Sequence, residues 1–221
     1  PQGIAVVGNK IFSSEHGPSS DDELNLLVSG GNYGWPYVAG FQDNQSYKFI
    51  DWSTAPKDAA VDPNVPDPRV KVQLESEWKA PENYKDPVKT FYTVREGYNY
   101  HDGDIYGDIS YVEWPTVAPS SINYYVDGPM KGWENSILMT TLKAGTLFRI
   151  KLNNQKDNVQ GEVATFFHTP NRYRDIAVSP DGNTFYILTD SAGSARGEDL
   201  KPTTKLQNPG SILMIKYNKN K

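Results

Sequence analysis

The sequence contains no cysteine, which excludes disulfide bonds, thiolate metal sites and cysteine nucleophiles. It also has no apolar run of about eighteen residues or more, so we expect no membrane-spanning helix. Acidic residues (27) outnumber basic ones (22), and no basic stripe is present that could follow a phosphate backbone. Nucleic acid is therefore not an expected partner.

Histidine is scarce, and the common catalytic motifs are missing. The three histidines, His16, His101 and His168, do not have the spacing of metal ligands. No nucleophile elbow, P-loop or glycine-rich dinucleotide motif occurs, so hydrolase and nucleotide-binding functions have no support. No amphipathic helix of three turns is predicted. The best short helical candidate covers 21–29, with Ser19 or Ser20 as a possible cap.

Turn-forming and aromatic residues are abundant by contrast. The chain holds 18 Gly, 16 Pro and 14 Tyr among 221 residues, and this composition suits many short strands joined by ordered loops. Residues 4–17 and 176–190 share one pattern, an apolar strand, a Gly-Asn turn, a second apolar strand and a polar loop. Another hairpin is predicted over 136–152, and a last strand over 210–217. The fold class is therefore all-β, and the repeated unit favours the blades of a propeller over a sandwich or barrel.

Two segments depart from this strand pattern. Residues 52–88 are rich in proline and charge and read as a long surface insertion within a single domain covering 1–221. Residues 98–119 are rich in Tyr, Asp, Gly, Trp and Pro and read as a structured loop.

Three basic side chains could form an anion receptor. Arg172 and Arg174 lie two apart, so on a strand they point to the same face and offer two guanidinium forks to carboxylates or phosphates. The alternative is an ordinary solvated strand edge. Lys143, in the turn of the hairpin over 136–152, either completes this receptor or is a surface lysine.

A second candidate site follows the first hairpin. Glu15-His16-Gly17-Pro18 precedes an acidic run at 21–23, and Gly-Pro at a strand end can turn carbonyls toward a hard cation such as Ca²⁺. The alternative is a helix N-cap followed by an acidic first turn.

Several strings together resemble the soluble PQQ-dependent glucose dehydrogenases of the glucose/sorbosone dehydrogenase family. The resemblance runs in order through nearly the whole chain. The strings are SEHGPSSDDELNLLVSGGNYGWPYVAG (14–40), LESEWKAPENYKDPVKTFYTV (74–94), YVEWPTVAPSS (111–121), GWENSILMTTLKAGTLFRIKL (132–152), NRYRDIAVSPDGNTFYILTDSAG (171–193) and NPGSILMIKY (208–217).

The resemblance implies a six-bladed β-propeller that holds pyrroloquinoline quinone (PQQ) over a Ca²⁺ ion, with this chain supplying roughly the C-terminal half of the blades. It also implies roles for particular residues. The residues expected to hold PQQ are Lys143, Thr116, Arg172 and Arg174. Those expected to line the sugar site are Tyr111 and Trp114. The carbonyls expected to bind the Ca²⁺ beneath PQQ are those of Gly17 and Pro18. A second, structural Ca²⁺ site is expected from Glu23, the Tyr33 carbonyl, Asp43 and Glu75.

The sequence also departs from that family. The family's general-base histidine and an Arg-Asn pair would lie upstream of Pro1, and we expect an upstream part to be missing. His16 stands where the glucose enzyme has glutamine, so it is a pocket residue and not the expected base. Tyr106 and Glu113 stand at about the positions of the family's paired cysteines, which puts the order of that loop and the sugar preference in doubt.

The expected function is PQQ- and Ca²⁺-dependent oxidation of an aldose to its lactone, with an N-terminal half from the same gene or a second chain. The resemblance implies a periplasmic or secreted location. The alternatives are a degenerate propeller that binds carbohydrate or protein without redox chemistry, and a structural fragment. Half a propeller leaves open edges, so we expect the lone chain not to be a free monomer, and a homo-oligomer is one outcome.

Overall fold

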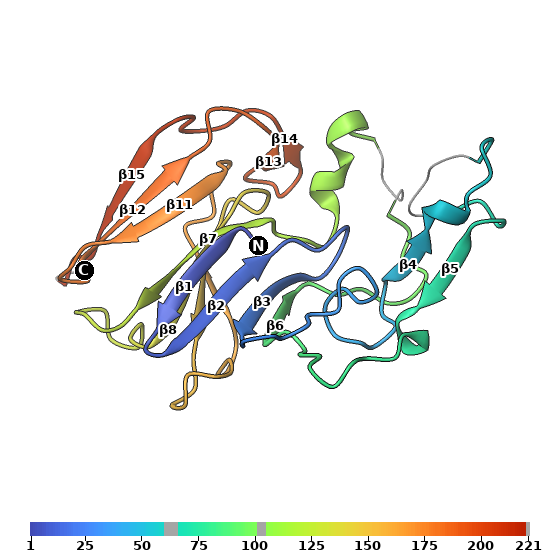
Figure 1. Cartoon of the computed structure of the whole chain (residues 1–221). Coiled ribbons are helices and arrows are strands. Elements are labelled where there is room, and N and C mark those ends of the chain that lie inside the picture. Colours follow the sequence, from blue (N-terminus) through green and yellow to red (C-terminus); the bar gives the residue numbers. More distant parts are fainter. Residues whose placement is uncertain (60–65, 101–104, 220–221) are drawn as a thin grey trace.

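The computed structural model describes residues 1–59, 66–100 and 105–219. In these parts the chain consists of antiparallel strands and short 3-10 helices, arranged in three successive sheets and two small hairpins (Figure 1). The all-β prediction is confirmed. None of the helices in the described ranges has the length and apolar character needed to cross a bilayer.

The strands follow chain order within each sheet. The first sheet has the order β1 (Gly3–Val7), β2 (Lys10–Glu15), β3 (Asp22–Leu27) and β6 (Lys89–Phe91). The second is built from β7 (Pro119–Tyr125), β8 (Ser136–Thr141), β9 (Leu147–Lys151) and β10 (Ala164–Phe166). The third is built from β11 (Tyr173–Val178), β12 (Thr184–Thr189) and β15 (Ile212–Lys216).

The remaining elements are short. Two hairpins pair β4 (Lys48–Asp51) with β5 (Lys71–Leu74) and β13 (Ala195–Arg196) with β14 (Pro202–Thr203). Three 3-10 helices are η1 (Trp52–Thr54), η2 (Glu75–Glu77) and η3 (Gly107–Glu113).

The hairpins predicted from the repeated pattern are present as β1–β2, β8–β9 and β11–β12, and the last predicted strand is β15. Gly8 and Gly182 in the first and third turns have positive φ angles of 66° and 68°. Such turns admit glycine readily because it has no Cβ to clash with the backbone.

The helical candidate at 21–29 is wrong, because residues 22–27 form strand β3. This strand pairs with β2 on one side and β6 on the other, and it places Asp22, Leu24 and Asn25 in the interior. The acidic start resembled a helix N-terminus, but ladder hydrogen bonds on both sides outweigh that local preference.

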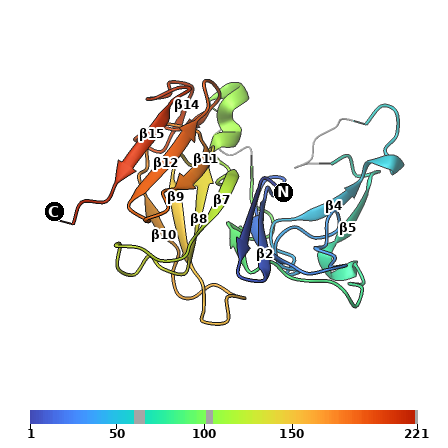
Figure 2. The same ribbon diagram turned by 60° about the vertical axis from the view of Figure 1, so that its left-hand side comes forward.

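The proline-rich segment does hold some regular structure. It contains η1, β5 and η2, and β5 pairs with β4 just before the segment, whereas residues 60–65 lie outside the described ranges. The β4–β5 hairpin lies apart from the three main sheets (Figures 1 and 2). The structured loop predicted at 98–119 contains η3, although 101–104 also lie outside the described ranges.

Strand β7 packs between the first strands of the other two sheets, β1 and β11. A Cβ on Gly3 at the start of β1 would lie 2.9 Å from the Ser121 backbone, and Ser121 Oγ donates to Asp175 of β11 at 2.6 Å. Successive antiparallel sheets whose first strands lie side by side are the arrangement of neighbouring propeller blades.

The middle sheet is buried on both faces. In β8, Ile137 and Met139 belong to a core shared with the first sheet, whereas Leu138 belongs to a core shared with the third sheet. All six residues of β8 are buried for this reason. The strand therefore reads as a continuous apolar and small-residue run instead of an alternating one.

The outer faces of the first and third sheets are apolar and exposed. Ile4 and Val6 of β1 are 62% and 65% exposed, and Ile212 and Met214 of β15 are 67% and 65% exposed. Because a sheet gains stability by burying its apolar face, these two faces lack the layer that would cover them within this chain.

We predict that Gly145→Ala destabilises the chain far more than Gly8→Ala. Both glycines have positive φ, but a Cβ on Gly145 would lie 2.2 Å from Thr169 O, whereas nothing lies within 4 Å at Gly8. We expect a loss of about 1 kcal/mol in the free energy of unfolding at Gly8 and about 3 kcal/mol at Gly145. Urea unfolding measures both, and equal losses would contradict the steric argument.

Candidate functional site

The predicted PQQ-binding side chains gather at one end of the sheets. Strand register explains this, because the start of β7 pairs with the end of β8 (Pro119 with Thr141) and the start of β11 pairs with the end of β12 (Tyr173 with Thr189). Loops adjoining these ends carry the residues expected at the cofactor. The same end of the first sheet leads into the loop at 16–18, since the end of β2 pairs with the starts of β1 and β3.

Lys143 is a buried lysine and not a surface one. Its side chain lies in the β8–β9 turn, the residue is only 3% exposed, and Nζ donates to Tyr111 O (3.3 Å), Trp114 O (3.0 Å) and Thr116 Oγ1. Burial and the neighbouring Arg196 lower the pKa of Lys143 to about 7, while Asp22 acts in the opposite direction. The structure therefore brings Lys143 and Thr116 together, as expected.

Arg196 is a site residue that the sequence reasoning missed. Its guanidinium donates to three carbonyls of the loop that carries the expected sugar residues: Val112 O (3.3 Å), Trp114 O (2.9 Å) and Thr116 O (3.0 Å). No pattern in the sequence marks it, because an isolated arginine in a two-residue strand looks like surface.

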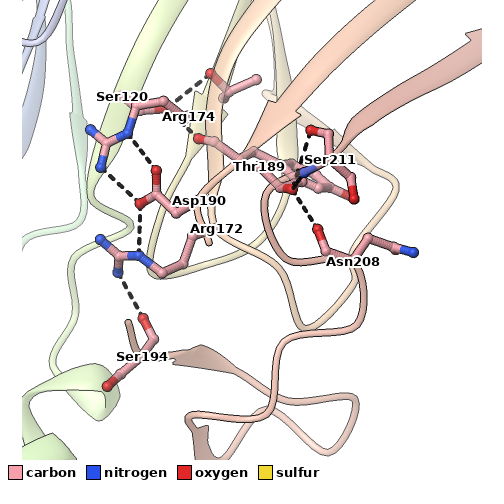
Figure 3. Close-up of polar contacts among 10 residues, drawn as sticks. Ser120, Arg172, Arg174, Thr189, Asp190, Ser194, Asn208 and Ser211 are labelled. Carbon is pink, nitrogen blue, oxygen red and sulfur yellow. Dashed lines mark hydrogen bonds and ion pairs between the residues drawn. The ribbon is translucent and has the colours of Figure 1, made fainter. Parts of the chain in front are cut away.

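Arg172 and Arg174 converge on a shared carboxylate, that of Asp190 (Figure 3). Arg174 binds it through Nε and Nη2, both at 2.8 Å, and Arg172 through Nε at 3.0 Å. Arg172 Nη1 also donates to Ser194 O at 2.8 Å. Hydrogen bonds from Arg174, the larger contribution, and from Arg172 lower the pKa of Asp190. Asp190 is therefore ionised at neutral pH.

The surroundings of Asp190 fix its position. The residue follows β12, where Thr189 Oγ1 accepts from Ser211 N at 2.9 Å and donates to Asn208 O (Figure 3). The Asp190 amide donates to Arg172 O at 2.9 Å. The sequence pattern placed Thr189-Asp190 in a polar loop after the strand. The available signal was an acid at the end of the hairpin strand that pairs with the strand of the two arginines.

Asp22 links the loop at 16–18 to the loop that follows Thr116. This buried carboxylate accepts from Gly17 N at 3.0 Å, and from Val117 N and Ala118 N at 2.6 and 2.8 Å. Burial raises its pKa, and the three backbone donors oppose that shift. Asp22 thus ties the loop expected to hold Ca²⁺ to the loop that follows Thr116.

The four residues expected at a second Ca²⁺ site are not gathered as side-chain ligands. Glu75 is fully buried and accepts from the backbone N–H groups of Ala39, Asp43 and Asn44 at 3.1, 3.2 and 2.8 Å. Within the described ranges, no group of three or more His, Cys, Asp and Glu side chains has the geometry to hold a metal. The second site therefore stays a prediction.

The side chains of Glu23 and Glu75, two of the residues expected at the second Ca²⁺ site, lie where negative charge is costly. Burial raises the pKa of both Glu23 and Glu75 to about 7, and the neighbouring acids Glu15, Asp21 and Asp43 contribute in the same direction. Glu23 accepts from Gly40 N at 2.6 Å, whereas Tyr33 donates its hydroxyl to Leu26 O at 3.1 Å.

The aromatic residues expected at the sugar site lie together. Tyr111 and Trp114 are in edge contact with ring centroids 6.4 Å apart, and Trp114 contacts Tyr100 at 5.6 Å. Tyr111 is 41% exposed. His16 is exposed and its Nε2 is 2.8 Å from Pro119 O, which places it beside the start of β7.

A cavity of about 640 Å³ lies on the other side of Tyr100, between the β4–β5 hairpin and the loop at 96–100. Pro18 and Ser20 form part of its wall, but none of the expected PQQ-binding side chains does. The expected PQQ-binding side chains and this cavity are therefore separate features.

The sequence matches the family model described as Glucose / Sorbosone dehydrogenase over residues 1–65 and 80–197. The chain belongs to the glucose/sorbosone dehydrogenase family. It is 45% identical over 224 residues to quinoprotein glucose dehydrogenase B of Acinetobacter calcoaceticus, covering 98% of this chain and 46% of that protein. It is 25% identical to the aldose sugar dehydrogenase YliI of Escherichia coli K12, covering 91% and 41%.

Solved structures of this family share the fold. A glucose dehydrogenase crystal structure matches with a TM-score of 0.53 at 23% identity, covering 86% of this chain and 41% of that one. The PQQ-bound aldose sugar dehydrogenase of Streptomyces coelicolor matches with a TM-score of 0.50 at 21% identity, covering 91% and 41%. The chain thus spans less than half the length of these relatives.

We predict that Lys143 makes the free energy of unfolding increase with pH between about 7 and 10. Because the folded pKa is about 7 and the unfolded value is about 10.4, the unfolded state binds more protons between these values, and stability rises with pH across that window. Lys143→Met removes this contribution, so the stability of wild type relative to Lys143→Met should rise between pH 7 and 10. Thermal unfolding of both at each pH measures it, with the exposed Lys131→Met as control. A constant difference would contradict the prediction.

Proposed function

We propose that this chain forms part of a PQQ- and Ca²⁺-dependent dehydrogenase that oxidises an aldose to its lactone. The observation that carries the proposal is the cationic wall of Lys143, Arg172 and Arg174, built beside Thr116 in a chain of this family. Oxidoreductase activity on sugars is also what the names of the relatives describe.

The charges of the wall suit a polyanionic cofactor. Arg172 and Arg174 share the single carboxylate of Asp190, which leaves one positive charge in excess. Lys143 and Arg196 have the single buried carboxylate of Asp22 nearby. Arg172 Nη2 and Arg174 Nη1 make no hydrogen bond within the described part of the chain. A planar tricarboxylate would use these donors and balance the excess charge.

Each residue would then have a distinct task. Arg172 and Arg174, oriented by Asp190, would bind and orient the carboxylates of PQQ, and Lys143 would add a point charge next to the Thr116 hydroxyl. Tyr111 and Trp114 would pack on the apolar face of the sugar ring and keep water away from it. When bound, the quinone would serve as the two-electron acceptor.

The proton of the sugar hydroxyl needs a base that these residues do not supply. The exposed His16 is hydrogen-bonded to Pro119 O, so we assign it to the wall of the pocket and expect the base in another segment. The aldose substrate class and the lactone product are proposed from the family resemblance alone.

The turn at 16–22 suits a cation held by backbone oxygens. A Cβ on Gly17 would lie 1.8 Å from Ser20 O and 2.6 Å from Asp21 O, so backbone oxygens already crowd this glycine. Oxygen ligands are those that Ca²⁺ prefers. We propose that the carbonyls of Gly17 and Pro18 hold one Ca²⁺ and that Asp22 fixes their loop.

We also propose that a second segment completes a six-bladed propeller. The support is the pair of exposed apolar faces on β1 and on β15, at the two ends of the row of sheets, and the coverage of less than half of each relative. A periplasmic or secreted location is proposed from the family resemblance alone.

A non-catalytic propeller that binds a ligand is the second candidate, and one observation favours it. Lys143 Nζ donates three hydrogen bonds to other groups of this chain. Arg172 and Arg174 both donate to Asp190. The structure thus holds together without an external anion.

Calorimetric titration of the chain with PQQ in Ca²⁺ and again in EDTA tests the proposal. We expect Ca²⁺-dependent binding that weakens about tenfold or more in Arg172→Ala, because a charge-assisted hydrogen-bonding partner is lost. Arg149→Ala, which removes an arginine bound to Gly132 O away from the site, should bind as wild type does. If PQQ binds neither this chain nor its mixture with the N-terminal half, the non-catalytic candidate is favoured.

We predict that the lone chain self-associates through its exposed apolar faces. Replacing Val6 and Met214 by Lys should shift its sedimentation profile toward monomer, because charge opposes burial of those faces. Leu200→Lys is the matched control, since Leu200 is 62% exposed but lies between β13 and β14. A monomeric wild-type chain would refute this.

A further inference from the structure

The carbonyl oxygen of Trp114 accepts more hydrogen bonds than it has lone pairs. Thr116 N donates to it at 2.7 Å, Arg196 Nη2 at 2.9 Å and Lys143 Nζ at 3.0 Å. A carbonyl oxygen has two lone pairs, so one of these three donors is in excess. The backbone donor is fixed by the turn, which leaves Arg196 and Lys143 as competitors.

Arg196 is the better placed of the two cations. Its Nη2 also donates to Thr116 O at 3.0 Å and its Nε to Val112 O, so one rigid planar group spans three carbonyls of the same loop. Its own backbone N–H donates to Lys143 O at 2.9 Å, which anchors strand β13 to the β8–β9 turn. Releasing Arg196 would free all of these acceptors together.

Lys143 is held less firmly. The positive charge of Arg196 nearby opposes the charge of Lys143. A lysine ammonium rotates freely on a flexible stem, so it can exchange one acceptor for another. Its Thr116 contact is to a hydroxyl, which can also accept from or donate to another partner.

We propose that Arg196 is the positioning residue that holds the 111–116 loop, so that Lys143 can leave its carbonyl acceptors for an incoming anion without loss of loop order. The identity of the anion in this assignment rests on the proposed function. The role of Arg196 in holding the loop does not. It assigns the partly buried Arg196 as the permanent brace and the buried Lys143 as the group that can exchange its acceptors for a ligand.

Hydrogen–deuterium exchange on the whole chain tests the division of roles. In Arg196→Met we expect exchange over residues 107–118 to rise about tenfold, because the loop opens locally when its brace is lost. In Lys143→Met we expect the same amides to stay within about twofold of wild type. Arg149→Met is the control, since Arg149 also donates to a backbone carbonyl, that of Gly132.

Two outcomes would overturn the assignment. One is equal loosening of 107–118 in Lys143→Met and Arg196→Met. The other is a rise in Arg196→Met that spreads equally over β8 and β12, which would show a general loss of stability. Arg196→Lys, with one ammonium in place of the fork, should give an intermediate exchange rate, whereas exchange as fast as in Arg196→Met would show that charge contributes nothing.

Titration of the same variants with PQQ in Ca²⁺ separates this inference from the proposed function. Lys143→Met should bind PQQ more weakly while its 107–118 loop stays ordered. Arg196→Met should also bind PQQ more weakly, but with a loop that has lost its order. If wild type binds no PQQ even with the N-terminal half present, the proposed function fails. The exchange measurement still decides the role of Arg196 in that case.

Discussion

The packing of β7 between β1 and β11 is the constraint on which the candidate site depends. Strand β7 contacts both β1 and β11, and the loops beyond the starts of β7 and β11 carry the residues expected at the cofactor. The Ser121–Asp175 hydrogen bond and the close approach of Gly3 to Ser121 fix the alignment of the sheets.

Four basic side chains at this end face two carboxylates, so positive charge is in excess. Asp190 orients Arg172 and Arg174, while Asp22 lies near Lys143 and Arg196 and receives backbone donors from two loops. A charge removed from water is costly without partners, and each of the two acids accepts several hydrogen bonds. The proposed binding of a polyanionic cofactor would use the remaining positive charge.

Local patterns predicted the hairpins well and the rest of the fold less well. The turns at Gly8 and Gly182 and the apolar runs on either side of them depend on neighbours in sequence, so their strands could be read directly. Strand β3 was misassigned because its acidic start is typical of a helix, and its true partners are strands β2 and β6. Pairing between distant segments decided that element.

The sequence by itself determined the all-β class, the family, and the set of Lys143, Thr116, Arg172 and Arg174 as basic and polar candidates. Only the tertiary structure showed that Lys143 is buried, that Asp190 lies between the two arginines, and that Arg196 donates to carbonyls of the loop of Trp114. The reason is physical. A side chain's partners are set by which strand ends meet in space, and Arg196 lies more than eighty residues from the carbonyls of Val112 and Trp114 that it holds.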